Sequence, residues 1–446
     1  MVEDKNPDKQ TSAEPTNQAD ALLVEEFKSK LWRSRKSIII GVVVTVVVLI
    51  TILVTVKLTS DNKSLEYQTD NNGQRTIELT EAVKAGKRLS NERCNGEGVT
   101  TKLAVSPMKP EDFSIVVPYG LVVGGHVTPI DHQYFSPASY NSKPDAYEVR
   151  AMGDATLVDI GSRPRPFGEE YRLVFTVSCT FLYYYDLVTS LSPELKQAYE
   201  ARKNNNESIN LQVKAGQVIG RIGGQTLDFA VWDTTKPLSG FIEHEHYEAE
   251  AWKIFTADPL DYYTDDLKSF ILSRYVRDVE PISGKIDYDE DGKLIGNWFM
   301  EGYVGYGGDR QDSSGAYWRT HLSFAPDLYD PTWFIISIGS YATEKDGLGA
   351  QFVTPTNSPQ PQDVSVDTGM VKYELTQWNY IDGKGSSWNR TSLVKGLKVT
   401  SSSMGTSGGC AVVEMIDARK IKFEVFKNKS CDSVAGFTSE ASIYTR

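Results

Sequence analysis

The longest apolar stretch of the chain lies near its start, where residues 38–56 are mostly Val, Ile and Leu with only Gly and Thr between them. A helix over this run would be roughly 28 Å long at about 1.5 Å per residue, close to the thickness of the hydrocarbon core of a bilayer. Such a helix satisfies its own backbone hydrogen bonds inside lipid. The pattern therefore predicts one transmembrane helix over residues 38–57.

Positive charge is concentrated on the N-terminal side of this run. The cations there are Lys28, Lys30, Arg33, Arg35 and Lys36. Because such charges stay on the cytoplasmic side, we expect residues 1–37 to be a disordered, basic cytoplasmic segment. The protein is then a single-pass protein of the cell membrane, with the bulk of the chain extracytoplasmic.

Beyond the apolar run the pattern changes twice. Residues 58–107 are polar and predict a stalk, with one helical stretch near residues 77–89. From residue 108 onward, short apolar and aromatic runs alternate with Gly, Pro, Asn and Asp, which is typical of many short strands. We expect a mainly β protein with two extracytoplasmic domains, at 108–280 and 281–446, because this much chain exceeds one usual core. A single helix is predicted from Pro193 to Lys203, with Ser192 as its N-cap.

The net charge and the cysteine content limit which kinds of partner and which cellular compartment fit this chain. The net charge is −12, which argues against a nucleic-acid partner. Four cysteines all lie on the predicted outer side, so we expect two disulfides. Cys410 and Cys431 flank a predicted hairpin and form one pair, which leaves Cys94 and Cys179 as the other.

One segment of the first domain resembles a known family. It reads Val213-Lys-Ala-Gly-Gln-Val-Ile-Gly-Arg-Ile-Gly-Gly224, followed by Leu227-Asp-Phe-Ala-Val231. This stretch is similar to the core of the lysostaphin-like (LytM-type) zinc metalloendopeptidases, in which a V-x-x-G-Q-x-I-G-x-x-G stretch precedes a His-x-His-Phe strand. The resemblance covers about residues 113–263 and implies an endopeptidase-like β barrel or sandwich.

The chemistry that the resemblance implies needs a zinc ion held by His, Asp and the second His of the His-x-His pair, with two further His handling protons. Here the His-x-His positions read Thr226-Leu-Asp228, and four residues instead of three separate His126 from Asp131. The chain therefore resembles a degenerate member of the family. An atypical metal group of His126, Asp131, His132 and Asp228 stays open, as does one built on His244 and His246.

The second domain carries two weaker signals. Asp287, Asp289 and Asp291 copy the start of a calcium-binding loop, but Trp298 stands where that loop ends in Glu. A turn between strands at 285–288 and 294–299 is the alternative. Gly296-Asn-Trp298 resembles the Gly-x-Trp of lipocalin-like barrels, so we expect an antiparallel barrel here.

These signals favour a membrane-anchored protein whose endopeptidase-like domain does not catalyse but binds cell-envelope polymer or a partner protein. Two alternatives stay open: a zinc-dependent cell-wall peptide hydrolase with an atypical ligand set, and a lipocalin-like ligand carrier or sensor acting through the C-terminal domain. We expect no cofactor, and zinc is the metal to test for. The expected partners are the bilayer and the envelope polymer or protein.

Overall fold

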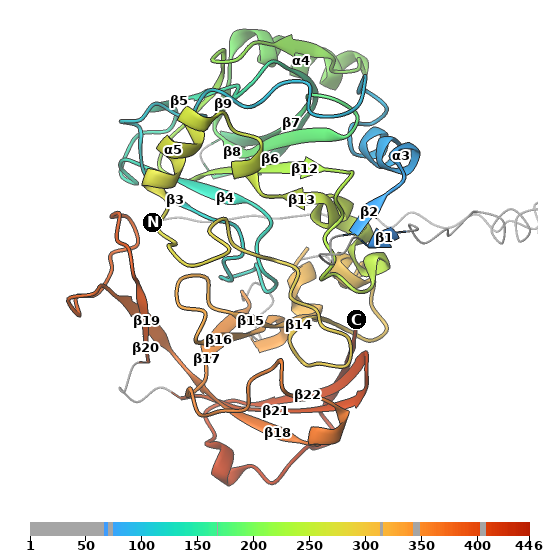
Figure 1. Ribbon diagram of the computed structural model, residues 1–446, viewed down its shortest axis with the longest axis vertical. Helices are drawn as coiled ribbons and strands as arrows, with labels where there is room; N and C mark the ends of the chain where they lie inside the picture. Colours follow the sequence, from blue (N-terminus) through green and yellow to red (C-terminus); the bar gives the residue numbers. More distant parts are fainter. Residues whose placement is uncertain (1–66, 70–74, 167, 313–314, 342–347, 402–406) are drawn as a thin grey trace, which may run out of the picture. The chain divides into compact units, whose positions relative to one another are not determined.

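The computed structural model describes residues 67–69, 75–166, 168–312, 315–341, 348–401 and 407–446 (Figure 1). These residues belong to one compact unit, Leu65–Arg446. The predicted cytoplasmic segment 1–37 and the predicted transmembrane helix 38–57 lie outside the described residues. Within the described ranges, no helix has both the length and the apolar character needed to cross a membrane.

The chain is mainly β, as predicted. Its first part forms an antiparallel sheet in the order β10-β6-β7-β8-β12-β4-β3, with β13 paired to β12. The strands are β3 (Phe113–Val117), β4 (Gln133–Pro137), β6 (Ala155–Arg165), β7 (Gly168–Thr176), β8 (Phe181–Val188), β10 (Leu211–Val213), β12 (Leu227–Asp233) and β13 (Thr256–Ala257). A three-stranded sheet joins β5 (Tyr147–Arg150), β11 (Val218–Ile222) and β9 (Ser190–Leu191).

Both faces of the central strands are buried. In β8, Tyr183 and Tyr185 point into one hydrophobic cluster, while Leu182 and Tyr184 point into another. Successive strand residues face opposite sides, so a strand covered on both sides becomes apolar throughout. This explains why β8 and β12 read as nearly continuous apolar runs.

Helices and 3₁₀ turns cover this sheet. Helix α4 (Pro193–Asn205) confirms the predicted helix, and the Ser192 side chain accepts a hydrogen bond from the Leu195 N–H. Helix α5 (Asp265–Arg274) and the 3₁₀ segments η1 (His244–Phe255) and η2 (Pro259–Asp261) follow β12 and were not predicted.

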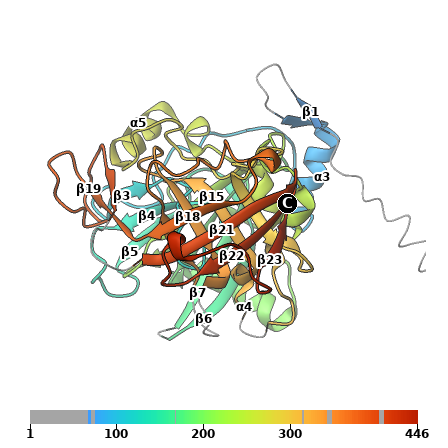
Figure 2. The same ribbon diagram turned by 90° about the horizontal axis from the view of Figure 1, so that it is seen from below.

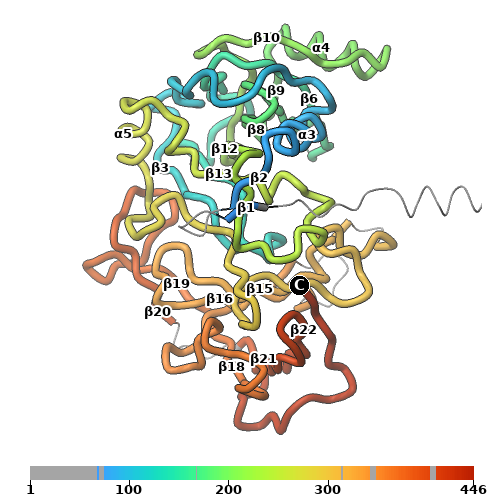
Figure 3. The backbone as a smooth tube through the Cα atoms, turned by 45° about the vertical axis from the view of Figure 1, so that its right-hand side comes forward, coloured from blue at the N-terminus to red at the C-terminus, as the bar shows by residue number. Residues whose placement is uncertain are grey.

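The described part of the predicted stalk packs onto the sheet. It contains β1 (Tyr67–Thr69), β2 (Arg75–Ile77) and α3 (Leu79–Leu89). Ala82 and Ala85 of α3 are buried in the cluster that holds Tyr184, and Figure 3 shows the blue helix beside the green strands. The polar composition of this segment reflects the outer face of a packed helix rather than an extended spacer.

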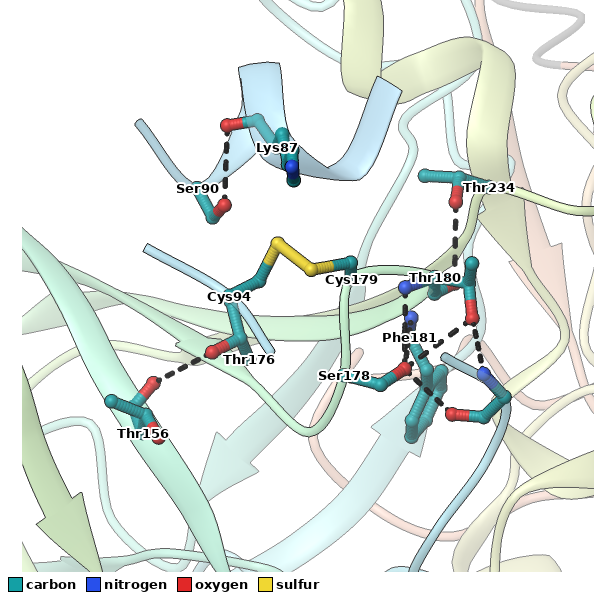
Figure 4. Close-up of a disulfide and its surroundings, with 11 residues drawn as sticks. Lys87, Ser90, Cys94, Thr156, Thr176, Ser178, Cys179, Thr180, Phe181 and Thr234 are labelled. Carbon is teal, nitrogen blue, oxygen red and sulfur yellow. Dashed lines mark hydrogen bonds between the residues drawn. A yellow bond between two sulfur atoms is a disulfide. The ribbon is translucent and has the colours of Figure 1, made fainter. Parts of the chain in front are cut away.

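Two disulfides confirm the predicted pairs. Cys94 bonds to Cys179 in the turn between β7 and β8, and Cys410 bonds to Cys431. Figure 4 shows the first disulfide beside Ser178, whose hydroxyl donates to the Gly98 carbonyl at 2.6 Å and accepts from the Phe181 N–H. The disulfide and these hydrogen bonds fasten the segment after α3 to the sheet.

The second part of the chain closes into an eight-stranded antiparallel barrel, which confirms the predicted barrel. In barrel order the strands are β14 (Gly296–Met300), β15 (His321–Pro326), β16 (Phe334–Ile338), β17 (Ala350–Val353), β18 (Val371–Thr376), β21 (Ser407–Asp417), β22 (Lys420–Phe426) and β23 (Ser442–Thr445). Figure 2 shows β21, β22 and β23 side by side. Short 3₁₀ turns connect the strands: η3 (Gly305–Gly307), η4 (Tyr317–Thr320), η5 (Gly339–Tyr341), η6 (Val366–Thr368) and η7 (Cys431–Ser433).

The Gly-x-Trp segment lies at the closure of this barrel. Trp298 is fully buried, and its Nε1 donates to the Leu294 carbonyl at 2.8 Å. The guanidinium of Arg446 lies 4.1 Å from the Trp298 ring centroid and donates to the backbone carbonyls of Ile295 and Glu290. The last residue of the chain therefore covers the start of the barrel.

A separate hairpin arm leaves the barrel between β18 and β21. It pairs β19 (Trp378–Ile381) with β20 (Lys398–Ser401). One hydrophobic cluster joins Val117 of β3, Ile335 of the barrel and Tyr380 of the arm. The two β assemblies therefore share a core, and the predicted division near residue 280 stays a prediction.

Candidate binding site

Three of the four predicted metal-site residues meet where β4 and β12 lie side by side. The His132 ring lies between two carboxylates: its Nδ1 is 3.1 Å from Asp131 Oδ1, and its Nε2 is 3.2 Å from Asp228 Oδ2. All three side chains are buried. The sequence brings them together because Asp228 pairs with Tyr134 in the β12–β4 register, two residues beyond His132.

A lysine from η1 completes this cluster. Lys253 Nζ lies 3.0 Å from Asp131 Oδ1 and 3.2 Å from Glu250 Oε2, and the Lys253 side chain is 5% exposed. The neighbouring Trp252 donates its Nε1–H to Asp131 Oδ2 at 2.9 Å. We call Asp131, His132, Asp228 and Lys253 the polar centre.

The charges of the polar centre compensate one another. Burial alone would disfavour a charged imidazole, but Asp228 and Asp131 outweigh it and raise the pKa of His132 to about 9. Burial would likewise raise the pKa of Asp131, but Lys253 and His132 hold it well below its ordinary value. Burial raises the pKa of Asp228 above 3.8, against the charge of His132. The polar centre thus sets two basic side chains, His132 and Lys253, against two acidic ones, Asp131 and Asp228.

His126 does not join this arrangement. Its ring centroid lies 5.8 Å from that of His132, and burial lowers its pKa to about 3. His132, which is adjacent to Asp131 in the chain, lies between the carboxylates instead. The described residues contain no group of three or more His, Cys, Asp and Glu side chains arranged to hold a metal ion.

Among the described residues this group is not arranged as a metal site, and the predicted metal group stays a prediction. A zinc ligand must direct a lone pair at the metal. Here both nitrogens of His132 face carboxylates, and Asp131 is already bonded to Lys253 and Trp252. The residues present do not fit zinc.

The other candidate ligands also serve structural roles. His246 stacks on Phe299 with ring centroids 5.1 Å apart, and burial lowers the pKa of His244 to about 4. Burial outweighs the influence of Arg446 and raises the pKa of Asp289 to about 6.

The calcium-like loop is not formed as predicted. Asp287 accepts a hydrogen bond from the Gly240 N–H at 2.8 Å, and Asp289 accepts one from the Asn297 N–H at 2.7 Å. Asp291 pairs instead with Arg419. The three carboxylates are separately engaged, and the predicted strand at residues 285–288 is not formed.

A second row of charges continues from the polar centre across the sheet. Asp186 of β8 lies opposite Asp228 in the register and pairs with Arg163 of β6 at 2.8 Å. Arg163 also contacts Glu170 of β7. Sequence reasoning missed these residues, although Asp186 is a charged residue inside the otherwise apolar strand β8. That break in the apolar pattern was the available signal.

An aromatic cavity of about 210 Å³ adjoins the polar centre. Tyr134 lines it and has its hydroxyl 3.2 Å from His132 Nε2. Thr226 also lines it, with its hydroxyl 3.4 Å from Asp228 Oδ1. We call this cavity the tyrosine pocket; its further aromatic walls are Tyr140, Tyr329, Tyr380 and Trp388.

The walls of the tyrosine pocket come from both β assemblies. Tyr380 and Trp388 belong to the arm and its loop, and both contact Tyr329 edge-to-face, at 5.0 and 5.3 Å between ring centroids. The Tyr380 hydroxyl donates to Asp327, which fixes that wall. A mostly aromatic lining with a few polar groups is the lining that ligand sites commonly have.

Comparisons with known proteins give only distant similarity. No protein-family model matches this chain, and the search of curated proteins found no match. Similar solved structures include Csd3 of Helicobacter pylori, with 16% identity over 39% of this chain and 37% of that chain and a TM-score of 0.22. A zinc-containing peptidase from Vibrio cholerae has 16% identity, and the match covers 39% of this chain and 44% of the peptidase, with a TM-score of 0.22.

Lysostaphin has 13% identity over 68% of this chain and 100% of its own, with a TM-score of 0.23. This chain spans well under half the length of Csd3 and of the Vibrio peptidase. TM-scores of this size do not establish a shared fold. The family resemblance therefore continues to rest on the sequence motifs.

Proposed function

We propose that this chain is a membrane-anchored extracytoplasmic protein whose endopeptidase-like part binds the peptide of a cell-envelope polymer in the tyrosine pocket without cleaving it. The observation that carries the proposal is the position of His132 between Asp131 and Asp228. The anchoring rests on the apolar run at residues 38–57.

The way the carboxylates are used supports the proposed lack of catalysis. Metal-assisted peptide hydrolysis needs an ion that polarises the carbonyl and activates water. In the polar centre, the positive charge between the carboxylates is supplied by a protein side chain, and Lys253 adds a second cation. A buried imidazolium has no open coordination position for water or for a peptide carbonyl.

Binding is supported by the pocket beside this centre. Tyrosine and tryptophan offer large apolar faces together with hydroxyl or N–H groups, a combination that suits peptide ligands. Tyr140 is 42% exposed at the pocket, so it is available to a ligand without refolding of its surroundings. A polymer peptide entering there meets the hydroxyls of Tyr134 and Thr226 at the base of the pocket.

The matched pair Tyr140→Ala and Tyr303→Ala tests the proposal in the full chain in detergent micelles. Tyr303 is 43% exposed and does not line the pocket, so both variants lose the same amount of surface aromatic area. Cosedimentation with insoluble cell-wall material should fall about tenfold for Tyr140→Ala and stay unchanged for Tyr303→Ala. Equal binding by both variants and the wild type would show that the pocket does not bind the polymer.

Metal analysis and a cleavage assay test the alternative of an active hydrolase. We expect less than stoichiometric zinc after dialysis against zinc and no release of peptide fragments from the wall. Stoichiometric zinc that Asp228→Ala removes, together with cleavage that a chelator stops, would establish the zinc hydrolase instead.

The carrier alternative has one observation in its favour, the closed barrel with Trp298 under Arg446. Large side chains from the strands, such as Phe324, Phe423 and Tyr373, fill the core of this barrel. A native mass spectrum that retains an apolar ligand, lost on Tyr373→Trp, would favour the carrier.

A further inference from the structure

A second cavity of about 290 Å³ continues the tyrosine pocket along the arm. The two cavities share three lining residues, Leu121, Tyr380 and Arg390. Each cavity by itself lies below the range of about 300–1,000 Å³ that is usual for small-molecule sites. Because they adjoin at the same three residues, they suit an extended ligand that occupies both.

The second cavity has a wall suited to a peptide. Gln351 holds the chain at Gly124 from both sides: its Oε1 accepts from the Gly124 N–H at 2.9 Å, and its Nε2 donates to the Gly124 carbonyl at 3.1 Å. These bonds fix the loop that carries Leu121 and Val123. Val123 lines this cavity and is 40% exposed, so the wall offers apolar surface to a ligand side chain.

Arg390 is the cation at the junction of the two cavities. Its guanidinium carbon lies 5.6 Å from the Tyr380 ring centroid, and the side chain is exposed. Asn389 Oδ1 accepts hydrogen bonds from the Thr391 and Ser392 N–H groups at 3.0 and 2.9 Å, which holds the loop. The Arg390 backbone has φ of 63°, a conformation that costs free energy for a side chain with a Cβ. The loop therefore presents this side chain in a defined place.

We propose that Arg390 binds a carboxylate of an extended acidic peptide lying across both cavities, which makes it the residue that selects the ligand. This inference rests on the proposed function and names the chemistry of the same site's ligand. Charge complementarity carries it: the junction offers a planar cation whose N–H groups match a carboxylate in two-point geometry. Among the residues lining either cavity, Arg390 is the only Lys, Arg or His within the part of the chain that the structure describes.

The stacking on Tyr380 adds to this role. A guanidinium over an aromatic ring keeps its edge free for hydrogen bonds while its face is covered. Lysine at this position would keep the charge but lose both the stacking and the two-point geometry. Arg390→Lys should therefore restore only part of the selectivity that Arg390→Gln removes.

The experiment uses the full chain in detergent micelles and two synthetic probes. One is a wall-type tetrapeptide with free side-chain and terminal carboxylates, and the other is the same peptide with both carboxylates amidated. Titration calorimetry should give a dissociation constant about tenfold lower for the free acid in the wild type. Arg390→Gln should remove this difference, because the free acid should lose about ten times more affinity than the amidated peptide.

Lys384→Gln is the matched control, because Lys384 is an exposed cation on the same arm that lines neither cavity. It should keep the tenfold preference. If Arg390→Gln keeps the preference, or if Lys384→Gln removes it equally, Arg390 does not select the ligand. The proposed function then still stands if Tyr140→Ala abolishes binding of both peptides. If the wild type binds neither peptide nor insoluble wall, the proposed function itself fails.

Discussion

Replacing His132 by Gln tests the charge balance of the polar centre. The pKa of His132 is raised from 6.5 to about 9 in the folded chain. A group with a raised folded-state pKa stabilises the fold fully below its unfolded pKa, and this stabilisation is lost as the pH rises through the folded pKa. The difference between 6.5 and about 9 corresponds to about 3 kcal/mol, at 1.36 kcal/mol per pKa unit.

The expected result is a difference in the pH dependence of unfolding. Between pH 6.5 and 9.5 the wild type should lose about 3 kcal/mol of unfolding free energy relative to His132→Gln, whatever the cost of the substitution itself. The other four histidines do not interfere, because burial lowers their pKa values: to about 3 for His126 and His321, to about 4 for His244, and below the ordinary value for His246. They titrate on the acid side of this window.

Urea unfolding followed by tryptophan fluorescence at several pH values measures the free energy, and NMR of ¹⁵N-labelled histidine side chains measures the pKa directly. With five histidines in the chain, the spectrum has few signals to assign. The charge balance is refuted if the His132 ring loses its proton near pH 6.5. It is also refuted if the unfolding free energies of the two proteins change in parallel with pH.

Three further tests concern stability. Cys94→Ser with Cys179→Ser should cost about 4–5 kcal/mol of unfolding free energy in denaturant titration, since the residues are 85 apart, and reduction of the wild type should cost more, because it also opens the Cys410–Cys431 disulfide. Lys253→Met leaves a buried carboxylate less compensated and should cost about 3–5 kcal/mol; adding Asp131→Asn should recover part of this, and additive losses would contradict the pairing. Gly86→Ala should lower stability by about 3 kcal/mol, because its Cβ would overlap the Cys179 carbonyl, whereas helix propensity alone predicts a gain of about 1 kcal/mol.

Local patterns in the sequence predicted the features that depend on neighbouring residues. The helix at Pro193 followed from Ser192 and the first-turn proline. The Cys410–Cys431 disulfide followed from the predicted hairpin between these residues, and Cys94–Cys179 followed by elimination. The antiparallel barrel followed from short alternating strands and the Gly-x-Trp segment. In each case the deciding information lies within a few residues along the chain, or in a small number of cysteines.

The composition of the polar centre could not be predicted in this way. Lys253 reaches Asp131 from a 3₁₀ segment more than a hundred residues later, where the local pattern gave no sign of a buried cation. Whether His132 or His126 lies between the carboxylates depends on the conformation of the loop before β4, which the local sequence pattern does not give. Likewise, Arg446 follows the last strand of the barrel in the sequence but covers Trp298 of the first strand, which is its neighbour in space.

The tyrosine pocket gives a physical reason to treat the two β assemblies as one binding module. Tyr134 and Thr226 at its base belong to the sheet, whereas Tyr380 and Arg390 belong to the arm of the barrel. A division near residue 280 separates the base from the wall, so neither part alone holds a complete site. The shared cluster of Val117 and Tyr380 keeps the two sides together without a ligand, so binding does not have to supply the free energy of assembling the pocket.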